Sequence, residues 1–126
     1  MISTVTRWTE EQMEIFFQQY VTTALWSSLD DDGEPLDAVF SVDDFERESE
    51  QSLWEDCHDF VVSNWPDLSR LDPGQCGHDF WLSRNGHGTG FWDRGNGAIG
   101  DRLHAAAKVY GSVHLWADDN GWVHAE

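Results

Sequence analysis

The chain has 126 residues, of which 40% are hydrophobic and 13% aromatic, including eight tryptophans. A chain of this size suits one domain with its own core, and so large an aromatic content excludes a disordered protein. Twenty-four acidic residues against seven basic ones give a net charge of −17, so we expect no direct binding to nucleic acid, whose phosphates require dense Lys and Arg.

The first predicted element is a helix over residues 10–28, in which apolar side chains recur at helical spacing. Thr9 is its expected N-cap, and Gln12 stands where the third residue of a capping box belongs. Three glutamates in the first turns favour the same start, because they complement the helix dipole.

A loop is expected from Asp30 to Pro35, where acidic residues, a glycine and a proline follow one another. A short helical turn over residues 42–46 follows, with Ser41 as its cap. The stripe that begins at Leu53 predicts a second helix over residues 49–64, which Pro66 ends.

The second half changes its period, and alternation around glycine-rich turns predicts four strands: residues 78–83, 90–93, 113–116 and 122–124. A third helix is expected over residues 101–110, between the two hairpins. The predicted fold class is therefore α+β, a single domain over residues 1–126 with about three helices packed on a four-stranded antiparallel sheet, in the order ααββαββ. Residues 1–72 form its helical, acidic part and residues 73–126 its hairpin–helix–hairpin part.

Two cysteines, Cys57 and Cys76, are too few for a disulfide framework. Residues Met1 to Glu14 lack a basic region followed by an apolar core, so no signal peptide is expected. No apolar run approaches the roughly 20 residues that cross a bilayer, and we expect a cytoplasmic protein without membrane contact.

The acidic residues are concentrated in the first half of the chain. Residues 1–72 hold 18 acidic and three basic side chains, whereas residues 73–126 hold six and four. Thirteen acids lie between residues 30 and 59, with Arg47 as the one base among them. Carboxylates three or four positions apart on a helix lie about 5–6 Å from one another, which is comparable with the spacing of phosphates along a DNA strand.

The acidic block is therefore interpreted as a phosphate mimic that binds a basic partner. Its candidate partner-binding residues are Asp30, Asp31, Asp32, Glu34, Asp37, Asp43, Asp44, Glu46, Glu48, Glu50, Glu55, Asp56 and Asp59. Trp54 or Trp65 would anchor its rim. The alternatives are a solvated acidic face, an adaptation to high salt, which would spread acid over the whole surface, and another kind of acid-dependent binding.

A second group of polar residues surrounds the first predicted hairpin. His78, Asp79 and His87 are residue types that perform general acid–base work or bind a metal. No known zinc or hydrolase motif is present, however, and the neighbouring glycines fit a tight turn. We expect neither catalytic residues nor a metal or other cofactor, and the alternative is a small metal-dependent or His/Asp hydrolase.

The two cysteines raise the same question, because Cys57 with His58 and Cys76 with His78 would supply the donor types of a zinc site. Their spacing fits no structural zinc pattern. Buried cysteines that act as small hydrophobic residues are the more common case.

The segment CGHDFWLSRNGHGTGFWDRG over residues 76–95 resembles the signature segment of a family of small phage-encoded proteins, as do ALWSS at 24–28 and ADDNG at 117–121. The resemblance spans most of the chain and implies origin in a phage or mobile element. The biochemistry of that family is uncharacterised, so no catalytic residue carries over.

Together, the resemblance and the acidic block predict a non-enzymatic anti-defence protein of the anti-CRISPR or anti-restriction kind. Its partner would be a nucleic-acid-binding host protein with a basic surface: a CRISPR effector, a restriction enzyme or a repair protein. It would act in the host cytoplasm as a monomer or small homo-oligomer. A phage structural or interaction protein is the other alternative.

Overall fold

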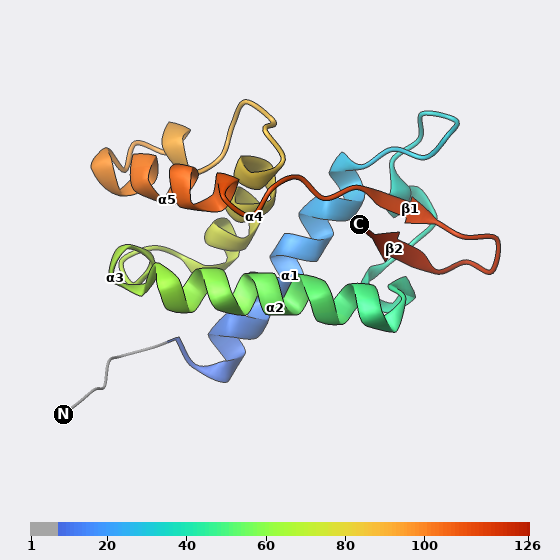
Figure 1. Ribbon diagram of the computed structural model, residues 1–126, viewed down its shortest axis with the longest axis horizontal. Helices are drawn as coiled ribbons and strands as arrows, with labels where there is room; N and C mark the ends of the chain where they lie inside the picture. Colours follow the sequence, from blue (N-terminus) through green and yellow to red (C-terminus); the bar gives the residue numbers. More distant parts are fainter. Residues whose placement is uncertain (1–7) are drawn as a thin grey trace.

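The computed structural model describes residues 8–126 and is mostly helical (Figure 1). Its helices are α1 (Glu10–Ser27), α2 (Arg47–Ser63), α3 (Trp65–Leu68), α4 (Pro73–Arg84) and α5 (Ala98–Lys108), with 3-10 turns η1 (Leu36–Ala38), η2 (Val42–Asp44) and η3 (Phe91–Asp93) and strands β1 (Leu115–Ala117) and β2 (Val123–Ala125). None of the helices in this part of the chain has the length and apolar character to cross a membrane. The expectation of no signal peptide concerns in part residues 1–7, which lie outside the described residues.

The predicted α+β fold with a four-stranded sheet is wrong, because the two strands expected at 78–83 and 90–93 are α4 and η3. Helix α4 begins at a local signal: the Asp72 carboxylate accepts the N–H of Gln75 at 2.9 Å, and Pro73 occupies the first helical position. Most of the helix is buried, and its buried residues include the polar Asp79, Ser83 and Arg84 as well as apolar ones, so no amphipathic stripe marks the helix in the sequence.

The other predicted elements are confirmed. Helices α1, α2 and α5 overlap the three predicted ranges, and the β1–β2 hairpin lies at the second predicted hairpin. The capping box between Thr9 and Gln12 is formed, and Ser41 caps η2.

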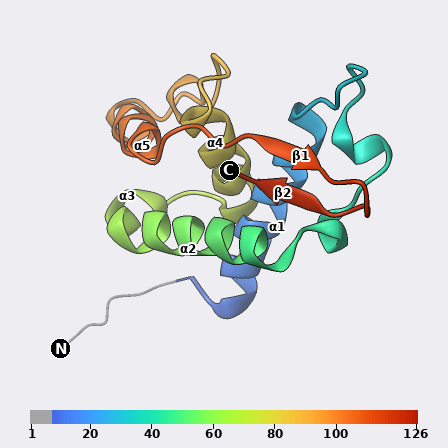
Figure 2. The same cartoon turned by 45° about the vertical axis from the view of Figure 1, so that its right-hand side comes forward.

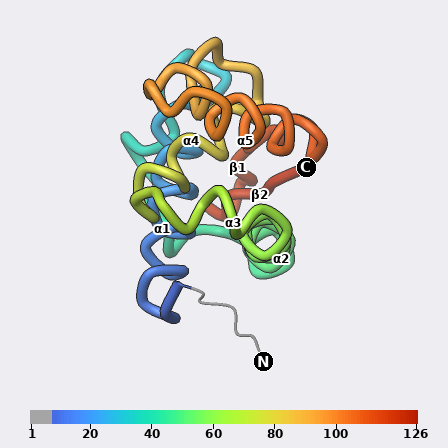
Figure 3. Tube along the Cα trace, turned by 90° about the vertical axis from the view of Figure 1, so that its left-hand side faces the viewer, coloured from blue at the N-terminus to red at the C-terminus, as the bar shows by residue number. Residues whose placement is uncertain are grey.

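The core lies where α1 crosses α2 and packs along α4 (Figures 1 and 3). The rings of Phe60 on α2 and Phe80 on α4 stack with centroids 4.1 Å apart. The backbones of α1 and α4 approach so closely at Gly77 that a Cβ there would lie 2.1 Å from the carbonyl oxygen of Phe16. A glycine in the middle of α4 is therefore a packing requirement.

The hairpin packs beside the first turn of α2 (Figure 2). Its strands are antiparallel, with Trp116 opposite His124. The N–H of Glu46 donates to the carbonyl of Val123 at 2.8 Å, and the N–H of Ala125 donates to Ser49 Oγ at 3.0 Å. The C-terminal end of the chain thereby fixes the point where the acidic segment enters α2.

Candidate acidic interface

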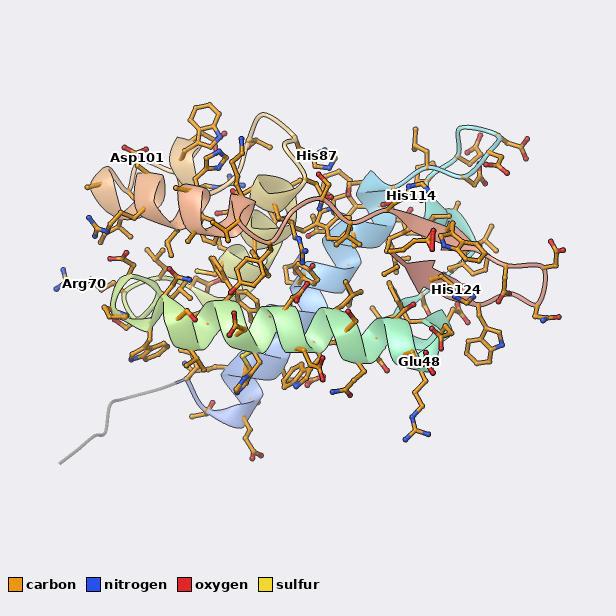
Figure 4. The ribbon with its side chains drawn as sticks, in the orientation of Figure 1. Glu48, Arg70, His87, Asp101, His114 and His124 are labelled. Carbon is orange, nitrogen blue, oxygen red and sulfur yellow. The ribbon has the colours of Figure 1, made fainter. Side chains whose placement is uncertain are left out.

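Most of the acidic block lies at one end of the molecule, which we call the acidic end and define as residues 30–50. It comprises the turn after α1, η1, η2 and the first turn of α2, with the hairpin between them (Figure 1). Glu48 and His124 mark this end in Figure 4, whereas Arg70 lies at the opposite end. Glu55, Asp56 and Asp59 belong to the block in sequence but lie further along α2.

Five of the thirteen acids have hydrogen-bonding roles within the fold: Asp30, Asp44, Glu46, Asp56 and Asp59. Asp30 Oδ1 closes the first turn by accepting the N–H groups of Asp32 at 2.8 Å and Glu34 at 2.9 Å. Asp44 accepts the N–H of Ser41 at 2.8 Å. These carboxylates shape the acidic end locally.

Glu46 is the N-cap of α2, and hydrogen bonds from the N–H groups of Glu48 and Ser49 lower its pKa. His124 lies near it and donates a 2.7 Å hydrogen bond from Nε2 to Asp118 Oδ2. That contact, followed by the N–H of Trp122, lowers the pKa of Asp118. The hairpin and the helix start are thus joined by an imidazole between two carboxylates.

Asp56 forms an ion pair with Arg84 at 2.9 Å, and the Arg84 side chain is only 2% exposed. The guanidinium also donates to Tyr20 Oη at 2.9 Å and to the carbonyl oxygens of Tyr110 and Gly111. Burial is the main reason why the pKa of Tyr20 is raised, so its hydroxyl stays neutral. This network joins α1, α2, α4 and the segment after α5.

Asp59 accepts a hydrogen bond from the hydroxyl of Tyr110. Asp56 and Asp59 are therefore bonded to α4 and to the segment after α5, whereas the other acids on α2 have no such bonds. The sequence could not distinguish them, because their partners lie 28 and 51 residues away.

The remaining eight acids have no cationic, backbone N–H or hydroxyl partner among residues 8–126; only a glutamine amide, from Gln51, reaches one of them, Glu55. We call them the open carboxylates: Asp31, Asp32, Glu34, Asp37, Asp43, Glu48, Glu50 and Glu55. All are exposed. Arg47, which lies among them, forms no ion pair within the described part of the chain.

The exposed aromatic residues near the acidic end differ from the expected ones. Trp65 is buried and meets the ring of Trp8 edge-on, and Trp54 is half-buried against Phe17. The exposed tryptophans at this end are Trp116 and Trp122 on the hairpin. For Trp116, alternation with the buried Leu115 is the sequence signal that could have placed it on the outer face.

The three residues of the alternative His/Asp site, His78, Asp79 and His87, are not brought together. Asp79 is buried and accepts a bidentate hydrogen bond from Arg94, with the shortest contact at 2.8 Å. His78 Nδ1 lies 2.9 Å from Thr23 Oγ1, and burial lowers the pKa of His78. His87 is exposed in the turn after α4 and forms no hydrogen bond to either residue among those described.

Cys57 and Cys76 are free and buried, and burial raises the pKa of both thiols. Within residues 8–126, no three His, Cys, Asp or Glu side chains are arranged to hold a metal ion. The hypothetical ligand set that added His58 and His78 to the cysteines is therefore not brought together.

The structure contains one Ser–His pair that the sequence did not indicate: His104 Nδ1 lies 3.0 Å from Ser83 Oγ. Ser83 Oγ also accepts the N–H of Phe91 at 3.2 Å, and Ser83 is completely buried. A nucleophile needs access to its substrate, so this pair joins α4 to α5 and η3 and does not form a hydrolytic centre.

No protein-family model matches the chain, and neither a curated protein nor a solved structure matches it. The resemblance to small phage proteins stays a prediction. The geometry defines a small, mostly helical protein with an acidic end that carries exposed aromatic side chains.

Proposed function

We propose that this protein is a non-enzymatic, phage-derived anti-defence protein that occupies the nucleic-acid-binding surface of a basic host protein. The observation that carries the proposal is the set of eight open carboxylates, seven of them within residues 30–50. Partner Lys and Arg side chains would exchange phosphates for these carboxylates.

The open carboxylates support a binding role because none of them forms an ion pair or accepts a backbone N–H within residues 8–126. Like charges crowded at one end destabilise a folded protein through mutual repulsion. A basic partner would relieve that repulsion on binding. Trp116 and Trp122 add apolar contact area of the kind that dominates many interfaces.

The proposal also narrows the predicted binding residues. Asp30, Asp44 and Glu46 hold turns and caps, and changing them would confuse loss of binding with loss of local structure. Asp31, Asp32 and Glu34 project on the same turn without such roles. They are the residues to change.

The test uses the triple variant Asp31→Asn, Asp32→Asn, Glu34→Gln. Its matched control, Glu11→Gln, Glu14→Gln, Asp101→Asn, removes three exposed charges elsewhere. Each protein is used to capture host proteins from nuclease-treated lysate, and the captured protein is then assayed for binding to its own nucleic acid with and without this protein. We expect wild type and control to capture a nucleic-acid-binding protein and block its nucleic acid, and the triple variant to lose both effects.

Salt provides a second readout on the captured complex. Between 0.05 and 0.5 M NaCl the screening length falls about threefold, so an affinity built on carboxylate–Lys/Arg pairs should fall with it. An affinity that stays flat or rises over this range, or a capture that contains no nucleic-acid-binding protein, would contradict the proposal.

A further inference from the structure

We propose that a small pocket beside β1 binds a single arginine side chain of a basic partner. The pocket lies between the first turn of the acidic end and the outer edge of β1, and it is lined by residues 29–31, Leu36 and residues 114–117. Its volume is about 180 Å³. Figure 4 marks His114 at the start of β1, below that turn.

The strand edge that borders the pocket has unused main-chain groups. His114 exchanges both its main-chain hydrogen bonds with Glu126, and the N–H of Asp118 donates to Trp122. Because main-chain groups alternate in direction along an antiparallel strand, those of Leu115 and Ala117 point away from β2. Among residues 8–126 they take no part in the hydrogen bonds outside the strand pair, so their carbonyl oxygens are open to a donor from the pocket.

The lining combines an apolar floor with an anionic rim. Leu36 and Leu115 are buried at 2% exposure each, and Leu29 is 57% exposed at the mouth. Asp31 is the free carboxylate, because Asp30 already accepts two N–H groups of its own turn. Such a lining suits a side chain with an aliphatic stem and a cationic head.

Size and donor geometry select the occupant. The volume of about 180 Å³ lies below the roughly 300–1,000 Å³ of clefts that hold drug-sized ligands, so the pocket suits one long side chain and not a strand or a helix. A guanidinium has five N–H donors in one plane, enough to serve a carboxylate and strand carbonyls together, and it is more weakly hydrated than an ammonium. Arginine therefore fits better than lysine.

This inference deepens the proposed function, on which it rests for the basic character of the partner. The open carboxylates would attract a basic surface over a distance, and the pocket would fix one residue of it. An anchor of this kind adds the specificity that exposed charge pairs alone lack.

The experiment follows backbone amide shifts of the full chain while blocked tripeptides are added: acetyl-Gly-Arg-Gly-amide, the same peptide with lysine, and the same peptide with citrulline, which keeps the shape without the charge. We expect saturable shifts confined to residues 29–31 and 114–117 for the arginine peptide, weaker ones for lysine and none for citrulline. Asp31→Asn should weaken arginine binding about threefold, as expected for loss of one exposed charge pair. Asp32→Asn, which removes the same charge from the same turn outside the pocket, should leave it unchanged.

Filling the pocket with Ala117→Met should abolish the saturable shifts, and the Asp31/Asp32 comparison tests the pocket even if that variant folds poorly. Equal effects of the two aspartate variants, equal binding of citrulline, or shifts spread over all open carboxylates would overturn the pocket. Failure of the pocket leaves the proposed function standing if the triple charge variant still loses its partner. If the triple variant keeps its partner, the proposed function fails whatever the peptides do.

Discussion

The same loss of charge should affect stability very differently at two adjacent acids on α2, Glu55 and Asp56. Asp56→Asn leaves the buried guanidinium of Arg84 without its anionic partner, although the tyrosine hydroxyl and two carbonyl oxygens remain as acceptors. Glu55→Gln removes an exposed carboxylate whose one contact is the amide of Gln51. Comparing these two variants separates the effect of a structural carboxylate from that of an open one.

The magnitude follows from the burial of the two partners. Breaking a buried pair costs about 3–5 kcal/mol, whereas exposed pairs contribute about 0.2–1 kcal/mol. The Arg84 side chain is 2% exposed and that of Asp56 is 36% exposed, so we place the cost of Asp56→Asn between the two ranges, at about 2 kcal/mol. For a chain of this length that corresponds to a fall in Tm of roughly 8 °C. Glu55→Gln should change the free energy of unfolding by less than about 0.5 kcal/mol.

Urea unfolding followed by tryptophan fluorescence measures both variants at the same pH and salt. Equal slopes with different midpoints would attribute the change to stability alone. If Asp56→Asn changes the free energy of unfolding as little as Glu55→Gln, the ion pair does not hold the four segments together. The distinction between structural and open carboxylates would then be wrong.

Three further outcomes are expected. Gly77→Ala should lower the free energy of unfolding by more than about 3 kcal/mol in thermal melts, because its Cβ would lie 2.1 Å from the Phe16 carbonyl oxygen and would overpack a rigid contact. Gly74→Ala is the control on the same helix: its Cβ would make ordinary contacts of 3.4 Å or more, and the variant should be nearly neutral. The pKa of Asp118 is lowered by the hydrogen bond with His124, so its stabilising effect is complete above its unfolded pKa near 4 and is lost as pH falls through the lowered value. Asp118→Asn should therefore flatten the acid limb of a plot of Tm against pH, and an unchanged limb would contradict the assignment. Raising NaCl from about 0.05 to 0.5 M should raise the Tm of the free wild-type protein by relieving repulsion among the open carboxylates, and a Tm that falls would show that attraction, not repulsion, prevails there.

The sequence predicts α1, α2 and α5 because apolar spacing is a local signal, to which α1 adds its Thr9 capping box. The sequence does not predict α4, because its aromatic residues and the glycines that follow it form a pattern typical of a hairpin. The start signal at Asp72 and Pro73 is present in the sequence, but a glycine at position 77 lowers the helix propensity of the segment. That glycine is explained only by the closeness of α1, which is a property of the tertiary structure.

The same limit applies to the candidate site. Composition locates the acidic block, yet it cannot tell Asp56 from Glu55, because the partner that distinguishes them comes from α4. Arg84 falls between the two strands that the sequence predicts at 78–83 and 90–93, and its partners come from α1, α2 and the segment after α5. Interactions between distant segments therefore decide which acids remain open.

The acidic end carries more charge than its own folding needs. Between residues 29 and 46 only Leu36 and Phe45 are buried, so caps, turns and the bond to β2 hold its shape. Uncharged serine, threonine or asparagine side chains cap such turns as well as aspartate does. The capping acids are thus replaceable in principle, and the open carboxylates add repulsion without adding a bond to a cation. These carboxylates lie beside exposed tryptophans and have no cation of their own within the described residues, which is the reason to look for their cationic partners on another molecule.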